Sequence, residues 1–253
     1  MTDKSKGKFA KYFDLLIKKD YKQEVSFLDF VFKRFGNVNK IIDLGCGTGN
    51  HAILLTKMGY KVVGVDIDAD MIQVASEKVE KENLYINFLK QDMKDLNVAE
   101  KFDAAISMWA AFQEVIKYED IKKTLNNVHD ALNDGGIFVL DLENPDMIIK
   151  YHQDFSIPSV MKAENIKIVL FYNKRLDLQN KLLSVVAIGF IEDEGKLSLE
   201  IEDNNLRILF LDDVLKLLKE AHFEVIDVLG NYNLTEKFDS NKRRMLFIAR
   251  KLK

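Results

Sequence analysis

The sequence predicts an α/β protein built around one doubly wound, mostly parallel sheet. Between Lys40 and Leu142, short β-branched runs alternate with amphipathic helical stretches, an order typical of a parallel sheet with helices on both faces. A glycine-rich turn at residues 45–49 joins the first of these runs to a helix, as in other doubly wound folds. Only two prolines occur in the 253 residues and no Gly/Ser-rich linker does, so we expect one large domain or a domain with an insertion.

The first expected element is a helix from Phe9 to Phe35, because apolar residues recur there at helical spacing and Gly36 follows as a terminator. In the alternating region we expect, in chain order, a strand at 41–44, a helix at 51–58, a strand at 61–65 that ends at Asp66, a helix capped by Asp68, strands at 86–89 and 102–106, a helix at 118–132, a turn at 133–136 and a strand at 137–140.

Helical periodicity stops between residues 165 and 210. Three β-rich runs at 166–172, 182–191 and 197–201, separated by short polar turns, predict an antiparallel meander inserted after the fifth strand. The regular order returns with a helix at 212–221 and strands at 223–228 and 245–249. A meander of this size is large enough to roof a pocket.

Composition predicts a soluble globular chain. Hydrophobic residues make up 47% and charged residues 30%, no stretch approaches the roughly 20 apolar residues of a membrane span, and no signal peptide is visible. The single cysteine, Cys46, cannot form an internal disulfide, so we expect a cytoplasmic protein without membrane contact. The four histidines are isolated, and we expect no metal site.

Charge argues against a dedicated nucleic-acid binder without excluding one. The net charge is −3, whereas such binders are usually strongly basic. The densest basic run, Asn241-Lys242-Arg243-Arg244, is expected to be a solvated turn before the last strand.

The chemistry centres on the loop after the first strand, Asp43-Leu44-Gly45-Cys46-Gly47-Thr48-Gly49-Asn50. Glycines let the backbone approach a ligand where a Cβ would collide. Dinucleotide-binding folds use G-x-G-x-x-G, whereas this loop has G-x-G-x-G with Asn50 in the slot of the third glycine. The acidic residue before the first glycine, Asp43, suits a ligand with a cationic ammonium better than a pyrophosphate.

Three further strand ends carry groups that suit one nucleoside ligand. Asp66 ends the second strand, where a carboxylate can accept hydrogen bonds from both hydroxyls of a ribose, and Ile67 follows it. After the third strand, the carboxylate of Gln91-Asp92-Met93 can accept from an adenine amino group while an apolar neighbour covers the ring. The fourth strand runs into Ser107-Met108-Trp109, whose backbone would border the rest of the ligand. Alternatively, either aspartate is only a helix cap or a turn residue.

These motifs resemble those of the class I S-adenosylmethionine-dependent methyltransferases. Residues 43–50 are similar to the first motif of that family, 63–66 to the second, 91–93 to the third, 102–108 to the fourth and 132–139 to the turn and strand that follow. The resemblance implies a seven-stranded Rossmann-like sheet in the order 3-2-1-4-5-7-6, its last strand antiparallel, with S-adenosyl-L-methionine as cofactor. It implies cofactor contacts from Asp43, Gly45, Cys46, Gly47, Gly49, Asp66, Ile67, Gln91, Asp92, Met93, Ser107 and Met108.

Three details are similar to the sugar-amine N-methyltransferases of antibiotic biosynthesis and, more loosely, to the glycine/sarcosine N-methyltransferases: Lys19-Asp20-Tyr21 with Glu24, the step Gly49-x-His51, and Ser107-Met108-Trp109. In both groups the segment after strand five covers the substrate pocket. The resemblance therefore implies a cofactor-binding half with N-terminal helices at 1–150, a substrate-covering insertion at 151–210 and a return to the main sheet at 211–253. The chain departs from the sugar enzymes at Ile17, where they place a tyrosine near the substrate.

Methyl transfer to an amine needs a neutral nucleophile held in line with the donor, so a base or a desolvating pocket is sufficient. His51 and Glu143 are the candidate catalytic residues, although His51 is also explained as a residue that packs beside the cofactor. Tyr12 and Tyr21 are candidates to cap the cofactor carboxylate from the N-terminal helices.

The expected function is methylation of a small molecule, at nitrogen, with Trp109, Phe112 and Asn144 in the substrate pocket. For these three the alternatives are core aromatics and a simple Asn144-Pro145 turn. Two other functions stay open: tRNA methylation, with lysine-rich termini that track phosphates, and a nicotinamide-dependent oxidoreductase, against which the G-x-G-x-G spacing and Asp92 argue. The sequence is compatible with a monomer or a homodimer.

Overall fold

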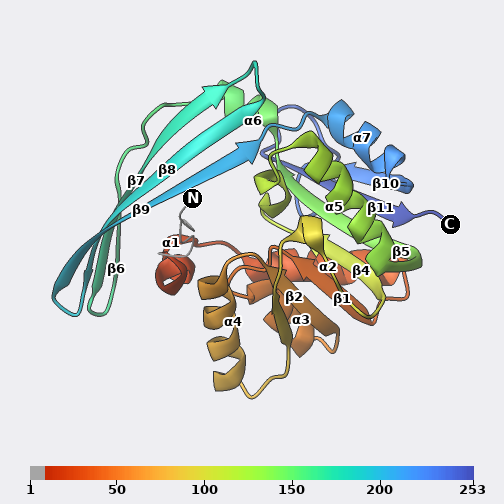
Figure 1. Ribbon diagram of the computed structural model, residues 1–253, viewed down its shortest axis with the longest axis horizontal. Coiled ribbons are helices and arrows are strands. Elements are labelled where there is room, and N and C mark those ends of the chain that lie inside the picture. The colour runs from red at the N-terminus through yellow and green to blue at the C-terminus, as the bar shows by residue number, and fades with distance from the viewer. Residues whose placement is uncertain (1–8) are drawn as a thin grey trace.

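The computed structural model describes residues 9–253, which form a seven-stranded mixed sheet with helices on both faces and a separate four-stranded sheet (Figure 1). The beginning of the lysine-rich N-terminal end, residues 1–8, lies outside the described residues. The strands of the large sheet are β1 (Lys40–Leu44), β2 (Lys61–Asp66), β3 (Asn87–Lys90), β4 (Phe102–Ser107), β5 (Leu132–Glu143), β10 (Phe223–Leu229) and β11 (Arg244–Lys251).

The strand order confirms the predicted fold class. The large sheet runs β3-β2-β1-β4-β5-β11-β10, which is 3-2-1-4-5-7-6 once the inserted strands are left out of the count. The strands from β1 to β5 pair in parallel, and β11 is antiparallel to both β5 and β10. The order reverses between β1 and β4, so a ligand crevice is expected at the carboxyl ends of these strands.

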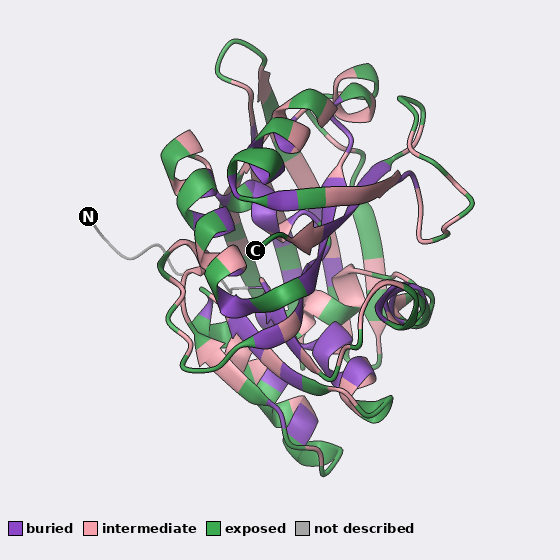
Figure 2. Ribbon diagram, turned by 90° about the vertical axis from the view of Figure 1, so that its right-hand side faces the viewer, coloured by how far each residue is buried: buried purple, intermediate pink, exposed green. Residues whose placement is uncertain are grey.

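Helices cover both faces of this sheet, and the buried residues lie in the strands and on the inner sides of the helices (Figure 2). The main helices are α2 (Tyr21–Phe35), α3 (Asn50–Lys57), α4 (Ala69–Lys81), α5 (Tyr118–Ala131) and α7 (Leu211–Glu220). Apolar residues of α2, α3 and α4 pack in one core cluster and those of α5 and α7 in another. Asp68 caps α4 as predicted, its carboxylate accepting from the N–H of Asp70 at 2.8 Å. Within residues 9–253, none of the helices combines the length and the apolar character that a membrane crossing requires.

The expected continuous helix from Phe9 to Phe35 is wrong. A 3-10 turn η1 (Ala10–Tyr12) and a single turn α1 (Phe13–Leu16) precede a non-helical segment at 17–20, and α2 begins at Tyr21. Asp20 caps α2 by accepting from the N–H of Gln23 at 3.0 Å, so a new helix starts there. The helix is interrupted because its two halves pack in different cores. Phe9 and Leu16 pack on the four-stranded sheet, whereas α2 packs on the large one.

The inserted meander has four strands rather than three: β6 (Ser159–Ala163), β7 (Ile166–Asp177), β8 (Leu182–Asp193) and β9 (Lys196–Arg207). Each pairs antiparallel with the next along the chain. The strands are longer than predicted because backbone pairing continues through polar residues, such as Asn173 opposite Val186. Glu194 and Gly195, with φ of 51° and 76°, form the two-residue hairpin turn between β8 and β9.

The structure also differs from the prediction at two places around β5. The strand begins at Leu132 rather than at residue 137, and residues 133–136 are looped out between the ladder pairs Phe102–Leu132 and Ala104–Ile137. After β5, an unpredicted short helix, α6 (Pro145–Lys150), begins with Asn144 as its N-cap.

The ring of Phe88, on β3, explains why two positions are occupied by glycine. A Cβ on Gly64 of β2 would lie 2.5 Å from Phe88 Cδ1, and a Cβ on Gly49 would lie 2.8 Å from Phe88 Cζ. The ring of Phe88 therefore fills the space that a side chain at either position would need.

We expect Gly64→Ala to lower the free energy of unfolding by about 1–3 kcal/mol, because the new methyl group overlaps Phe88 and packs 3.0 Å from Cys46 Sγ. Urea denaturation followed by circular dichroism measures the change. In a Phe88→Leu background the same substitution should cost clearly less, because the ring atoms are gone. An equal cost in both backgrounds would contradict the packing explanation.

Candidate functional site

A cavity of about 390 Å³ lies at the carboxyl ends of β1 to β4, beside the glycine-rich loop. Its wall also includes Glu202 and Asn204 of β9, so the inserted meander contributes to it. Nine of the predicted site residues line this cavity: Gly45, Gly47, Asp66, Ile67, Gln91, Asp92, Met93, Met108 and Trp109.

The glycine-rich loop has the backbone that its sequence predicts. Gly45 and Gly47 have φ of 72° and 53°, in the left-handed region that favours glycine. A Cβ on Gly45 would overlap the Cβ of Ala111, whereas one on Gly47 would meet nothing within 4 Å. The N–H of Gly47 donates to Asp66 Oδ2 at 2.7 Å. The end of β2 therefore fixes the loop beside the cavity.

Both carboxylates that the sequence singled out also hold backbone turns. Asp66 accepts from the N–H of Gly47 with one oxygen and from that of Asp68, at 2.9 Å, with the other. Burial raises the pKa of Asp66. Asp92 accepts from the N–H of Lys94 at 3.0 Å and pairs with its ammonium at 2.6 Å. The two interpretations of these aspartates are therefore compatible, because each one holds a turn and lines the cavity.

Two buried polar atoms at the neighbouring ends of β1 and β4 have no hydrogen-bond partner among the described residues. They are Asp43 Oδ2 and Ser107 Oγ, and both side chains are almost completely buried. β1 and β4 pair in register there, with Asp43 opposite Ile106. Burial raises the pKa of Asp43 to about 6. A buried acceptor without a partner is costly, so these atoms mark a place where a donor from a ligand fits.

Other predicted cofactor and pocket residues lie outside the cavity lining. Cys46 is buried, and burial raises the pKa of its thiol. Gly49 packs against Phe88, and Phe112 belongs to the core cluster that includes α5. The hydroxyl of Tyr12 donates to a carboxylate of the meander, Asp193, at 2.8 Å.

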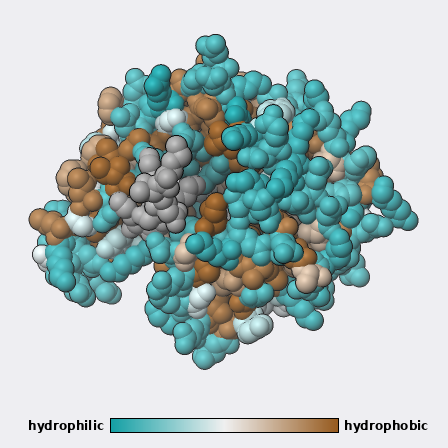
Figure 3. All heavy atoms as spheres, viewed as in Figure 1, coloured by the Kyte–Doolittle hydropathy of each residue, from teal (hydrophilic) through white to brown (hydrophobic). Residues whose placement is uncertain are grey.

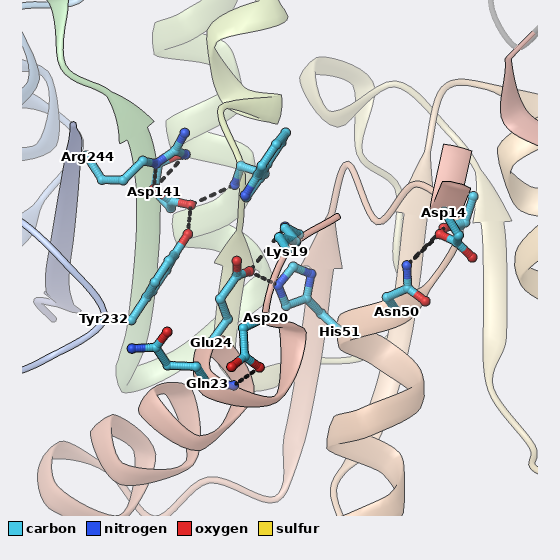
Figure 4. Close-up of polar contacts among 12 residues, drawn as sticks. Asp14, Lys19, Asp20, Gln23, Glu24, Asn50, His51, Asp141, Tyr232 and Arg244 are labelled. Atoms are coloured by element: carbon cyan, nitrogen blue, oxygen red, sulfur yellow. Dashed lines mark hydrogen bonds and ion pairs between the residues drawn. The ribbon is translucent and has the colours of Figure 1, made fainter. Parts of the chain in front are cut away.

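Lys19 of the segment before α2, Glu24 of α2 and His51 of α3 form a buried polar cluster (Figure 4). His51 Nε2 lies 2.6 Å from Glu24 Oε2, and Lys19 Nζ lies 3.1 Å from the same oxygen. The ammonium of Lys19 also lies 4.4 Å from the ring centroids of both Tyr21 and Trp109. Burial lowers the pKa of Lys19 to about 8. Burial alone would raise the pKa of Glu24, but its hydrogen bond with His51 and the charge of Lys19 outweigh burial and lower it.

A second buried cluster is centred on Asp141 of β5 (Figure 4). Its carboxylate accepts from the N–H of Trp109 at 2.8 Å, the hydroxyl of Tyr232 at 2.7 Å and Nε of Arg244 at 2.7 Å. Its carbonyl accepts from the N–H of Ala110 at 3.0 Å. Trp109 and Ala110 have φ of 59° and 66°, which is strained for side-chain-bearing residues. Asp141 therefore holds a strained turn at the wall of the cavity.

Sequence reasoning missed this cluster. The expectation of a solvated turn at 241–244 is wrong for Arg244, which is 9% exposed and paired with Asp141. One local signal was available: Asp141 is a charged residue inside the otherwise apolar run 137–142, and a buried charge needs a partner. Nothing local points to Arg244 as that partner, because 103 residues separate the two.

A second cavity, of about 380 Å³, lies beyond β5 between α6 and the meander. Its lining includes Glu143, Asn144, Lys174 and Arg243. Asn144 is 1% exposed, and its amide donates to backbone carbonyls of the segment before β11 at 2.7 Å and 3.1 Å. The Asn144 side chain is thus used in hydrogen bonds within the protein, whereas Glu143, Lys174 and Arg243 are less buried.

Arg244 lies between the two cavities. Its Cζ is 5.9 Å from the ring centroid of Trp109, which lines the first cavity. Its Nη1 is 3.7 Å from Glu143 Oε1, which lines the second. His51, in contrast, lines neither cavity.

Residues 41–136 match a family model described as a methyltransferase domain. The chain carries a methyltransferase domain. The match spans the strands and loops that form the first cavity from the glycine-rich loop to Asp120. It confirms the predicted enzyme class, and S-adenosylmethionine is the methyl donor of that class.

Relatives of this methyltransferase include N-methyltransferases. A glycine/sarcosine N-methyltransferase of Halorhodospira halochloris is 26% identical over 239 residues, which cover 91% of this chain and 81% of the relative. A solved S-adenosylmethionine-dependent methyltransferase from Clostridium acetobutylicum ATCC 824 has a TM-score of 0.86 at 22% identity, covering 97% of this chain and 98% of that one. The sugar N-methyltransferase KedS8 from Streptoalloteichus sp. ATCC 53650 has a TM-score of 0.81 at 19% identity, covering 100% and 96%. At these identities the two solved structures show the shared fold.

We expect Asp141→Ala to lower the free energy of unfolding of the methyltransferase by about 3–5 kcal/mol, because it leaves the guanidinium of Arg244 buried with only its longer contact, to Glu143 at 3.7 Å. Asp227→Ala is the matched control, since it removes an ion pair with the largely exposed Lys237 and should cost about 1 kcal/mol or less. Denaturant unfolding of the two variants measures both. Similar costs would contradict the role given to Asp141.

Proposed function

We propose that this methyltransferase transfers the methyl group of S-adenosylmethionine to a nitrogen atom of a small molecule that also carries an anionic group. The observation that carries this proposal is the pair of cavities on either side of Arg244, one beside the glycine-rich loop and one with cationic side chains in its wall. The glycine/sarcosine and sugar N-methyltransferases among the relatives support nitrogen as the acceptor atom.

The first cavity is our assignment for the cofactor. Gly45 and Gly47 let the backbone approach a ligand, and the orphaned Oδ2 of Asp43 would accept from an ammonium. Asp66 would accept from ribose hydroxyls, and Asp92 from an adenine amino group. S-adenosylmethionine supplies an electrophilic methyl group when bound.

The second cavity is our assignment for the acceptor. Arg243 and Lys174 line it, and neither forms an ion pair with a carboxylate among residues 9–253, so their charges are available to an anionic group. Glu143 lines it as well, and its Oε1 lies 3.7 Å from Nη1 of Arg244. An acceptor with a carboxylate or phosphate at one end and an amine at the other fits these charges.

Glu143 is the base that we favour. An amine must lose its proton before it can attack, and a carboxylate within reach of the acceptor can take that proton. Glu143 lines the second cavity, and its one described ion pair, with Arg244, is long at 3.7 Å. His51 is less suitable because it is buried, hydrogen-bonded to Glu24 and outside both cavities. The cluster of Lys19, Glu24 and His51 instead supports Trp109 through the contact of the ammonium with its ring.

An acceptor screen tests this proposal. We expect S-adenosylhomocysteine to form with amines that carry a carboxylate or phosphate and not with their uncharged analogues, and the methyl group to be found on nitrogen. Glu143→Gln should lower kcat for such an acceptor by about 100-fold, the lower range for loss of a general base, with S-adenosylmethionine binding unchanged. The control Glu77→Gln, on the exposed side of α4, should have no effect. Methylation of a hydroxyl, or of tRNA with a steep salt dependence, would contradict the proposal.

Cofactor binding should depend on pH through Asp43. Burial raises its pKa to about 6, above the ordinary value of about 4, so its carboxyl group is mostly protonated at pH 5. Only the ionised form attracts an ammonium, so the affinity for S-adenosylmethionine should increase from about pH 5 to about pH 7 and then level off. Calorimetric titration measures it. Asp43→Asn should bind more weakly and lose this dependence, and a constant affinity of the unaltered chain would show that Asp43 does not contact the cofactor.

A further inference from the structure

Trp109 lines the first cavity, directly after the end of β4 in the chain. Asp141 fixes the backbone there, because its carboxylate accepts from the N–H of Trp109 at 2.8 Å. That hydrogen bond holds the strained turn but not the side chain, which can still rotate among staggered conformations. The position of the ring therefore depends on the groups that contact the ring itself.

Two cations contact this ring. The ammonium of Lys19 lies 4.4 Å from the ring centroid, and Cζ of Arg244 lies 5.9 Å from it. A cation within about 6 Å of an aromatic centroid is attracted by the negative face of the ring, most strongly by that of tryptophan. Arg244 is the more distant of the two, and a guanidinium stays charged throughout the ordinary pH range. Lys19 is thus the closer cation and the one whose charge can change.

Lys19 is buried, unlike most charged side chains of this protein. Hydrophilic residues cover most of the face shown in Figure 3, where their charges contact water, whereas the side chain of Lys19 is only 9% exposed. A desolvated cation interacts more strongly with an aromatic ring than a hydrated one does. Lys19 lines neither cavity, so its influence on bound molecules is exerted through Trp109.

Glu24 keeps the ammonium of Lys19 charged at neutral pH. Nζ of Lys19 lies 3.1 Å from Glu24 Oε2, the same oxygen that lies 2.6 Å from His51 Nε2. Burial lowers the pKa of Lys19 to about 8, and the carboxylate of Glu24 limits that decrease. The charge of Lys19 is therefore lost a short way above neutral pH. The charged and titratable groups that face Lys19 are Glu24 and Tyr21 of α2, His51 of α3, Asp43 of β1, Asp141 of β5 and Arg244 of β11.

We propose that Lys19 is a positioning residue for methyl transfer, whose ammonium holds the ring of Trp109 in the wall of the first cavity only while it is charged. When Lys19 loses its proton, its attraction to the ring disappears and the ring is free to turn toward solvent. Since a displacement of about 1 Å in an active site can lower a rate about 100-fold, the loss of this contact limits methyl transfer at alkaline pH. The proposal is independent of the chemistry of the methyl acceptor.

The fluorescence of the ligand-free chain tests the proposal, because Trp109 is the one tryptophan in the 253 residues. We expect its emission to shift to longer wavelength as the pH rises through about 8, since a released ring gains contact with water. Tyr21, the other aromatic residue beside the ammonium, does not titrate in this range, because burial raises its pKa to about 12. An emission that stays constant from about pH 7 to about pH 9 would overturn the proposal.

Variants of Lys19 assign this transition to its ammonium. Lys19→Met keeps a long unbranched side chain without the charge, and its emission should lie at the longer wavelength at every pH. Lys19→Arg keeps a charge that does not titrate, so its emission should stay at the shorter wavelength up to about pH 10. The control Lys33→Met, on α2, removes an exposed ion pair with Asp29 and should titrate like the unaltered chain. Far-ultraviolet circular dichroism shows whether each variant is folded, and the titration of the unaltered chain needs no variant.

Glu24→Gln provides a second, independent test. The carboxylate of Glu24 raises the pKa of Lys19, so its removal should move the fluorescence transition to lower pH. A transition that moves to higher pH, or that does not move, would contradict the assignment to Lys19.

Kinetics separate a positioning role from direct contact with the cofactor. With any acceptor that the chain methylates, Lys19→Met should lower kcat about 10-fold or more and leave the affinity for S-adenosylmethionine nearly unchanged. Lys19→Arg should recover most of that kcat, and the kcat of the unaltered chain should decrease above about pH 8. Loss of S-adenosylmethionine binding in Lys19→Met, with the emission of its ligand-free form unchanged, would make Lys19 a cofactor ligand and overturn the proposal.

Discussion

The buried carboxylate of Asp141 is the constraint on which the rest of the site depends. An ionised group in the interior is tolerated only when it is paired and fully hydrogen-bonded, so Arg244, Tyr232 and the backbone of Trp109 must all remain in place around it. These partners come from the start of β11, the segment after β10 and the end of β4. One side chain thus fixes the antiparallel strand on β5, the strained turn beside the cavity and the guanidinium between the two cavities.

In the first cavity, too, single residues have more than one role. Asp66 and Asp92 hold the turns from which they project, so their carboxylates are oriented by the fold before any ligand arrives. Donors and acceptors that are fixed in this way need no reorganisation on binding. The glycine-rich loop is fixed by the same contacts, because Gly47 donates to Asp66. The meander adds the remaining wall from β9, which means that residues more than 100 positions apart in the chain share one cavity.

Most of the fold and the part of the site at the strand ends could be predicted from sequence, because both rest on local patterns. Apolar periodicity, the Asp68 cap and the glycine spacing each operate within a few residues, and parallel strands bring their carboxyl ends to one edge. The failures have a common physical cause. The break before Tyr21, the strand β6 and the burial of Arg244 each depend on what a segment packs against, which its own residues do not encode.

The sequence by itself determined the doubly wound sheet, the glycine-rich loop and the two aspartates at the ends of β2 and β3, since these features follow from spacing and residue type. Only the tertiary structure decided which charges are buried and paired. Glu24 meets His51, and Asp141 meets Arg244, across 27 and 103 residues of chain. The energy of a charge depends on its distance to other charges and to water, and both distances are set only when the whole chain has folded.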